Sequence, residues 1–95
     1  MTPDASAPWD RQAQPDQLAQ LHAALVAAAR TRLVDAARQL SATDLHVLFT
    51  AEPQGPLTAT GQVTGGGRSL CFCEAELHDP QGQLVARAMG SFRYR

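Results

Sequence analysis

The sequence predicts an α+β domain in which one long helix packs on a curved antiparallel sheet of about four strands. The first observation is an Ala-rich segment over residues 16–40 that contains no Gly or Pro. The second is an alternation of residue types that begins near residue 44, continues to residue 94 and is interrupted by turn sequences. Because a helix repeats about every 3.6 residues and a strand about every 2, the change of pattern marks the change of element.

The helix is predicted to run from Asp16 to about Leu40. Asp16 is a typical N-cap residue, and without Gly or Pro the helix can continue unbroken. Such a helix would have about 24 residues and a length of roughly 36 Å. Arg32 interrupts its apolar stripe, which consists of Leu18, Leu21, Leu25, Ala28, Ala29, Leu33, Ala36 and Leu40. Residues 41–44 are predicted to end the helix.

Four strands are predicted after the helix, over residues 44–51, 57–64, 68–78 and 83–94. Residues 53–56, Pro-Gln-Gly-Pro, end the first strand. Residues 65–67 are all Gly and form one hairpin turn, and residues 79–82 have Pro second and Gly fourth, as a type I turn prefers. The last three strands are therefore predicted to form an antiparallel meander.

The alternation also predicts which side of each strand packs on the helix. In the first strand, Leu45, Val47 and Phe49 are predicted to face the helical stripe. In the third strand the inward side is predicted to consist of Cys71, Cys73, Ala75 and Leu77. In the fourth strand both sides carry apolar residues, so either side could be inward.

The composition excludes several classes of protein. The chain has 95 residues, 8 Arg, no Lys, 9 acidic residues and a formal charge of -1. It is too short for a second domain and lacks the positive charge typical of nucleic-acid binding. Apolar residues make up 44% of the chain, but 17 of them are Ala and none is Ile. Because such a core is thin, we expect a homo-oligomer, a dimer or a tetramer, in which a partner chain covers the open sheet edge at residues 57–64.

Residues 1–15 contain three prolines and are predicted to form a flexible arm before a single domain over residues 16–95. The arm has neither the basic start nor the apolar run of a signal peptide, and the apolar segment over residues 18–29 is too short to span a bilayer. Cys71 and Cys73 lie one residue apart, a spacing that does not suit a disulfide within a strand. We therefore expect a cytoplasmic protein that does not associate with membranes.

No metal or cofactor site is predicted. Cys71 and Cys73 could be combined with His46 or His78, but zinc needs four convergent ligands and the sequence has no second Cys pair. The glycines at residues 65–67 are followed by Arg68 rather than by the Lys-Ser or Lys-Thr of a phosphate-binding loop.

The order of several segments resembles a known family. These segments are residues 44–49, the loop at residues 53–57, residues 58–63, the pair Gly67-Arg68 and residues 79–88. With them, residues 18–95 resemble the second half of hotdog-fold acyl-CoA thioesterases of the PaaI or 4-hydroxybenzoyl-CoA type. The resemblance implies a helix wrapped by the sheet, acyl-CoA pockets between two protomers, and a CoA thioester as substrate. It also implies that Gly67 and Arg68 contact CoA, with Arg68 offering a charged fork to phosphate.

The chain departs from this family before the helix. The family has an extra strand there and a His-Gly-Gly entry to the helix, followed by an Asp or Glu within it. Residues 1–17 do not resemble that strand. One register uses His22 as the entry and places Thr31 at the acid position, whereas the other uses residues 33–37 and supplies Asp35 but leaves few residues before the next strand. Both registers stay open.

The candidate catalytic residues are therefore Asp35 and His22. Thioester hydrolysis needs a carboxylate and backbone N–H donors for the oxyanion, commonly at a helix N-terminus. Asp35 is also typical of a solvated helix face paired with Arg32 or Arg38, and His22 of a half-buried core histidine. The leading hypothesis is acyl-CoA, or acyl-thioester, binding or hydrolysis, with weak or absent turnover. The alternative is a catalytically inert hotdog remnant that acts as a structural or protein-interaction module.

Overall fold

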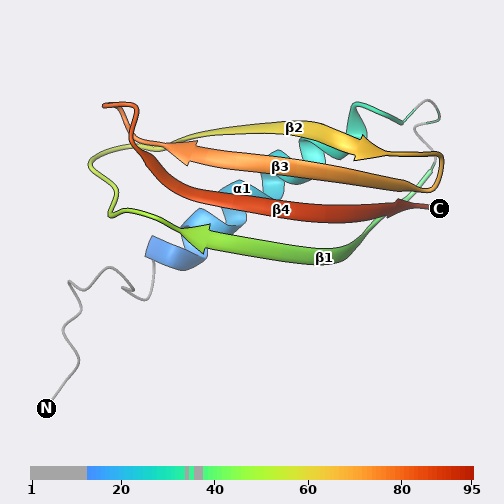
Figure 1. Ribbon diagram of the computed structural model, residues 1–95, viewed down its shortest axis with the longest axis horizontal. Helices are drawn as coiled ribbons and strands as arrows, with labels where there is room; N and C mark the ends of the chain where they lie inside the picture. The colour runs from blue at the N-terminus through green and yellow to red at the C-terminus, as the bar shows by residue number, and fades with distance from the viewer. Residues whose placement is uncertain (1–12, 34, 36–37) are drawn as a thin grey trace, which may run out of the picture.

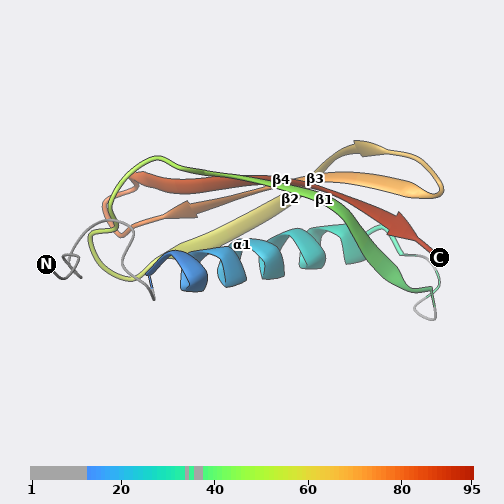
Figure 2. The same ribbon diagram turned by 90° about the horizontal axis from the view of Figure 1, so that it is seen from below.

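The structure is a computed structural model that describes residues 13–33, 35 and 38–95, and within them it has one helix and one antiparallel sheet. The elements are α1 (Ala13–Arg30), β1 (Leu40–Phe49), β2 (Thr58–Gly66), β3 (Leu70–His78) and β4 (Leu84–Tyr94). The strands lie side by side in the order β1-β4-β3-β2 (Figure 1). Figure 2 shows α1 running along one face of the sheet. The predicted α+β architecture is confirmed.

The strand order follows from two hairpins and one non-consecutive pairing. β2, β3 and β4 pair in sequence order as the predicted antiparallel meander. β1 pairs antiparallel with β4, from Leu40 opposite Tyr94 to Phe49 opposite Ala86. β1 and β2 are therefore the two edges of the described sheet. The position of β2 agrees with the expected open edge, and a partner chain at that edge stays a prediction.

The start of α1 differs from the sequence prediction. α1 begins at Ala13, so Asp16 lies in its first turn rather than at the N-cap. An acidic side chain in the first turn complements the positive end of the helix dipole, which explains why this position tolerates Asp. Residues 13–15 of the predicted arm are helical. Residues 1–12 of that arm lie outside the described residues.

The end of α1 corrects the prediction of a helix that continues to Leu40, because α1 ends at Arg30. The backbone N–H groups of residues 31–33 donate to carbonyls three residues earlier, the tighter pattern of a terminating helix. The Thr31 hydroxyl donates to the Ala28 carbonyl at 2.6 Å and so satisfies one of the last helical carbonyls. Residues 41–44, predicted as the stop, belong to β1.

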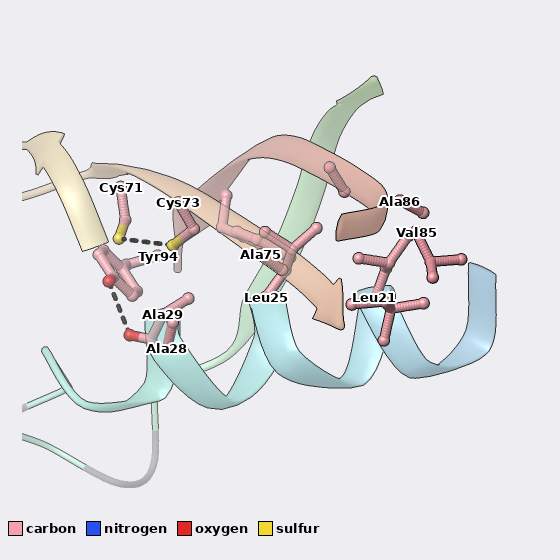
Figure 3. Packing of buried hydrophobic residues seen from close by; sticks show 13 residues of the cluster. Leu21, Leu25, Ala28, Ala29, Cys71, Cys73, Ala75, Val85, Ala86 and Tyr94 are labelled. Carbon is pink, nitrogen blue, oxygen red and sulfur yellow. Dashed lines mark hydrogen bonds between the residues drawn. The ribbon is translucent and has the colours of Figure 1, made fainter. Parts of the chain in front are cut away.

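The core lies between α1 and the sheet, and Figure 3 shows its packing. It consists of Leu21, Leu25, Ala28, Ala29, Cys71, Cys73, Ala75, Leu77, Val85, Ala86, Ala88, Phe92 and Tyr94. The predicted inward side of the third strand is confirmed. On β4, where the sequence left both sides open, Ala86 and Ala88 mark the inward side.

One side of β1 lies on the face of the sheet that α1 covers, but α1 leaves most of this side of β1 exposed. Leu45 pairs with Gly90 and Phe49 with Ala86, so both lie on the predicted side. α1 packs on β2, β3 and β4. As a result Leu45 is 47% exposed and Phe49 37% exposed, whereas Val47 is half-buried. The expected packing of this strand against the helical stripe is therefore wrong for Leu45 and Phe49.

Gly61 permits a close approach of α1 to the sheet. A Cβ built at Gly61 would lie 2.5 Å from the backbone oxygen of Ala24 on α1. Gly61 does not have the left-handed backbone that favours glycine, so the requirement is for space. The small side chains of Ala24 and of Ala75, which pairs with Gly61, add to the closeness of this contact.

Replacing Gly61 by Ala is expected to destabilise the protein by about 1–3 kcal/mol, because the added Cβ forces the Ala24 carbonyl away from β2. Gly67→Ala is the matched control, since a Cβ at Gly67 meets no atom within 4 Å. Its free energy of unfolding should change by less than about 0.5 kcal/mol. Urea unfolding measures both variants, and equal free energies of unfolding would contradict the tight packing of α1 on β2.

Two thiols and a phenol are buried together beneath the end of α1. The Sγ atoms of Cys71 and Cys73 lie 3.5 Å apart, and the Tyr94 hydroxyl donates to the Ala29 carbonyl at 2.8 Å (Figure 3). Burial, together with the hydrogen bond to Cys71 and its charge, raises the pKa of Cys73 from 9.0 to about 12. Burial and the neighbouring Cys71 also raise the pKa of Tyr94 from 10.0 to about 12. The folded core therefore keeps both groups protonated.

The protein is expected to lose stability as the pH rises above about 9. There the unfolded chain releases the Cys73 proton, and above pH 10 the Tyr94 proton, while the folded chain keeps both, so the unfolded state is favoured. Each group contributes a slope of up to about 1.4 kcal/mol per pH unit until its folded pKa is reached. Urea unfolding between pH 8 and 11 measures the slope, and Cys73→Ala should make it shallower. Equal slopes for the wild type and Cys73→Ala would show that Cys73 ionises alike in the folded and unfolded states.

Candidate functional site

One end of the molecule is where α1 and β4 end and where β2 turns into β3 (Figure 1), and the segments that meet there are rich in arginine. Arg30 occupies the last turn of α1, a position that suits a cation because the helix dipole is negative there. The segments that meet at this end carry Arg30, Arg32, Arg38, Arg68, Arg93 and Arg95. The formal charge of -1 conceals this uneven distribution.

An open hollow of about 510 Å³ lies at this arginine-rich end. It is lined by Arg32, Leu33, Asp35, Arg38, Gly67, Arg68 and Tyr94. Three arginines and one aspartate give the lining a formal charge of +2. A concave surface with this charge is suited to an anionic ligand, and its size lies within the roughly 300–1,000 Å³ of small-molecule sites.

Backbone carbonyls hold two of the lining guanidinium groups in place. Arg32 Nη1 donates to the Gly65 carbonyl at 3.2 Å. Arg38 Nη2 donates to the Tyr94 carbonyl at 3.1 Å, and Arg38 Nη1 to the Arg68 carbonyl at 3.5 Å. Because these acceptors are neutral, both guanidinium groups keep their charge for a ligand. Arg87, in the middle of β4, differs because its guanidinium is paired with the Glu76 carboxylate at 2.8 Å.

The structure places the four site residues predicted from the sequence in two different regions. Asp35, Gly67 and Arg68 line the same hollow although the sequence separates them widely. His22 is exposed on α1 and is not part of that lining. The two candidate catalytic residues are therefore not brought into one constellation.

Asp35 lies beyond the C-terminal end of α1. The helix has 18 residues and is therefore about 27 Å long. The backbone N–H groups that could bind an oxyanion are those of its first turn, at the opposite end. The hollow consequently unites a carboxylate with three cations but not with a helix N-terminus.

An apolar strip runs along the helix side of β1. It consists of Leu45, Val47 and Phe49, and two of these side chains are more than a third exposed. β1 begins at Leu40, opposite Tyr94 at the arginine-rich end. At about 3.3 Å per residue, Leu45 lies roughly 17 Å further along the strand. We call these three residues the β1 strip.

Comparison with solved structures finds the same arrangement in other proteins, some of them described as belonging or related to the thioesterase superfamily. The BH2602 protein from Bacillus halodurans, crystallised with CoA, is 18% identical and matches over 100% of this chain and 67% of its own, with a TM-score of 0.82. A protein from the thioesterase superfamily is 24% identical over 95% of this chain and 67% of its own, with a TM-score of 0.73. A protein from Shewanella oneidensis related to that superfamily is 31% identical over 57% of this chain and 36% of its own, with a TM-score of 0.53.

The chain has the hotdog fold. The resemblance predicted from residues 18–95 is thereby confirmed for the architecture, and the chain spans about two thirds of the first two structures. No protein-family model matches the sequence, and neither does any curated protein.

In this hotdog fold Arg38 and Tyr94 line the hollow, but neither was among the site residues predicted from the sequence. Arg38 was expected only as a salt-bridge partner of Asp35. The available signal was that arginines concentrate toward the ends of predicted elements: Arg30, Arg32 and Arg38 lie in the second half of the predicted helix, Arg68 begins the third strand, and Arg93 and Arg95 lie at the end of the fourth. The sequence predicted a hairpin turn at residues 65–67 but did not distinguish among its three glycines. Gly66 has a φ of 126° and would clash through a Cβ with the Leu70 carbonyl, whereas Gly67 has open space around it.

Within the part of the chain that the structure describes, no group of three or more His, Cys, Asp or Glu residues is arranged to hold a metal ion. Nor does any helix there have the length and apolar content needed to cross a membrane.

Proposed function

We propose that this protein binds acyl thioesters of CoA, with its phosphates at the arginine-rich hollow and its acyl chain on the β1 strip. The observation that carries the proposal is the hollow, because it gathers the guanidinium groups of Arg32 and Arg38 beside Gly67 and Arg68, the residues expected to contact CoA. Guanidinium groups bind phosphate through paired hydrogen bonds. The hotdog fold and the CoA in the crystals of the Bacillus halodurans protein support the same ligand.

The geometry fits an extended ligand. Phosphates held at the hollow and an acyl chain at Leu45 would be separated by roughly 17 Å along β1. The flexible part of the CoA thioester between its nucleotide and its thioester group would span that distance. On the β1 strip each buried CH₂ group contributes about 0.8 kcal/mol, so affinity should rise with acyl length.

We further propose that hydrolysis is weak or absent. The protein would then be catalytically inert, as in the alternative hypothesis, but would still bind the thioester. Hydrolysis needs a carboxylate close to oxyanion donors. Asp35 lies at the wrong end of α1, and position 31 is Thr rather than an acid. Asp16 is the carboxylate in the first turn of α1, so it is the residue to test if turnover is found.

Hexanoyl-CoA should bind more tightly than free CoA by at least about tenfold, because several CH₂ groups leave water on the β1 strip. Calorimetric titration measures both affinities. Leu45→Ser should remove most of the gain, whereas Phe72→Ser should not, since Phe72 lies on β3, on the side of the sheet that faces away from α1. In the same samples, release of the CoA thiol should stay near the uncatalysed rate.

Two results would contradict this account. Equal binding of CoA and hexanoyl-CoA would remove the β1 strip from the site. Rapid turnover that is lost in Asp35→Asn would make Asp35 the catalytic residue, and turnover lost only in Asp16→Asn would move the chemistry to the start of α1.

We also propose that two chains associate through β1. Three of its side chains, Leu45, Leu48 and Phe49, are large, apolar and more than a third exposed. β2, the edge expected from the sequence, instead exposes mainly Thr, Gln, Ala and Gly. Pairing of β1 edges would bury apolar surface and satisfy the open backbone groups of the strand.

Light scattering at micromolar concentration should show a dimer, or a larger homo-oligomer. Leu45→Glu should shift the protein toward monomer because it places charge beside the pairing edge, whereas Thr60→Glu on β2 should not. Dissociation by Thr60→Glu alone would assign the interface to β2. A monodisperse wild-type monomer would contradict both assignments.

A further inference from the structure

Arg38 is held as a flat platform at the wall of the hollow. Its guanidinium carbon lies 5.7 Å from the centre of the Tyr94 ring. Its edges donate to the Tyr94 and Arg68 carbonyls. Because one face covers the ring and the edges are engaged, the face left for a ligand is the opposite one.

Tyr94 is itself fixed on three sides. Its hydroxyl donates to the Ala29 carbonyl at 2.8 Å, its backbone N–H donates to the Ser69 carbonyl at 3.0 Å, and its side chain is buried. It therefore ties α1 and the β2–β3 turn to the last residues of β4. A platform resting on Tyr94 loses little conformational freedom when a ligand stacks on it.

We propose that the arginine-rich hollow recognises an adenine nucleotide, with the base stacked on Arg38 and the phosphates bound by Arg32 and Arg68. This inference rests on the proposed binding of CoA thioesters and names the part of CoA that this hollow takes. Nucleobases stack on guanidinium planes as they do on aromatic rings, and the Arg38 platform supplies such a plane.

The guanidinium N–H groups that are not used within the protein indicate where the phosphates of the nucleotide would bind. Each guanidinium has five N–H groups, and Arg32 uses one of them for the Gly65 carbonyl. Arg32 extends from the end of α1 and Arg68 from the β2–β3 turn, so the two reach the hollow from different elements. Two cations from different elements beside a stacking platform offer a nucleotide separate partners for its phosphates and for its base. Phosphate alone would use the cations but not the platform.

This arrangement predicts a selectivity. Thioesters carried on CoA would use the platform and both cations, whereas thioesters of pantetheine, which has no nucleotide, would use the β1 strip alone. The hollow would therefore make the protein select substrates by their nucleotide and not only by their acyl chain.

The test compares adenosine 3′,5′-bisphosphate with pyrophosphate in calorimetric titrations of the whole chain. Arg38→Lys keeps the charge but removes the plane, so it should weaken the adenosine bisphosphate by at least about fivefold and leave pyrophosphate within about twofold. Arg68→Gln should weaken both ligands. Arg93→Gln is the matched control, since Arg93 lies at the same end but not in the lining, and it should change neither by more than about twofold. Melting temperatures of all three variants establish that each remains folded.

Three outcomes would overturn the inference. They are no binding of the adenosine bisphosphate at millimolar concentration, equal losses for both ligands in Arg38→Lys, and an Arg93→Gln loss as large as that of Arg68→Gln. The last would show diffuse attraction rather than a site. If any one of these outcomes occurs while hexanoyl-pantetheine still binds through Leu45, the thioester proposal stands and the nucleotide site falls. If the nucleotide binds as expected while the acyl chain adds nothing, the nucleotide site stands and the thioester proposal falls.

Discussion

The contact between α1 and β2 at Gly61 sets the position of the helix on the sheet. A Cβ at Gly61 would lie 2.5 Å from the Ala24 backbone oxygen, so this contact exists only between small residues. With α1 drawn toward β2, the helix covers β2, β3 and β4 and leaves the apolar side of β1 exposed. The same placement brings the end of α1 beside the β2–β3 turn, where the arginines meet.

Tyr94 connects this packing to the candidate site. Its ring lies in the core beside the two buried thiols, and its hydroxyl binds the last full turn of α1. Its carbonyl and ring face hold Arg38 at the wall of the hollow. Tyr94 thus connects the buried core, where the Cys73 thiol and the phenol stay uncharged, to the surface where the charged arginines lie. The proposed binding at the hollow would therefore depend on the same contacts that stabilise the end of α1.

Local patterns in the sequence predicted the meander and the inward side of β3, because turn residues and period-two alternation are set by neighbouring residues. The end of α1 was missed because apolar spacing continues past Arg30, while termination depends on the Thr31 hydroxyl and on the pairing of Leu40 with Tyr94 across the sheet. The hollow could be predicted only in part. Asp35 and Arg68 were singled out separately, but their proximity arises from the non-local pairing of β1 with β4.

A crystal structure of the protein with hexanoyl-CoA would test the account most directly, since it observes the fold, the hollow and the β1 strip together. We expect the adenine ring on Arg38, phosphates between Arg32 and Arg68, and the acyl chain against Leu45 and Phe49, at an interface between two β1 strands. CoA bound elsewhere, with an empty hollow and a solvent-filled β1 strip, would contradict the proposed function and the further inference alike.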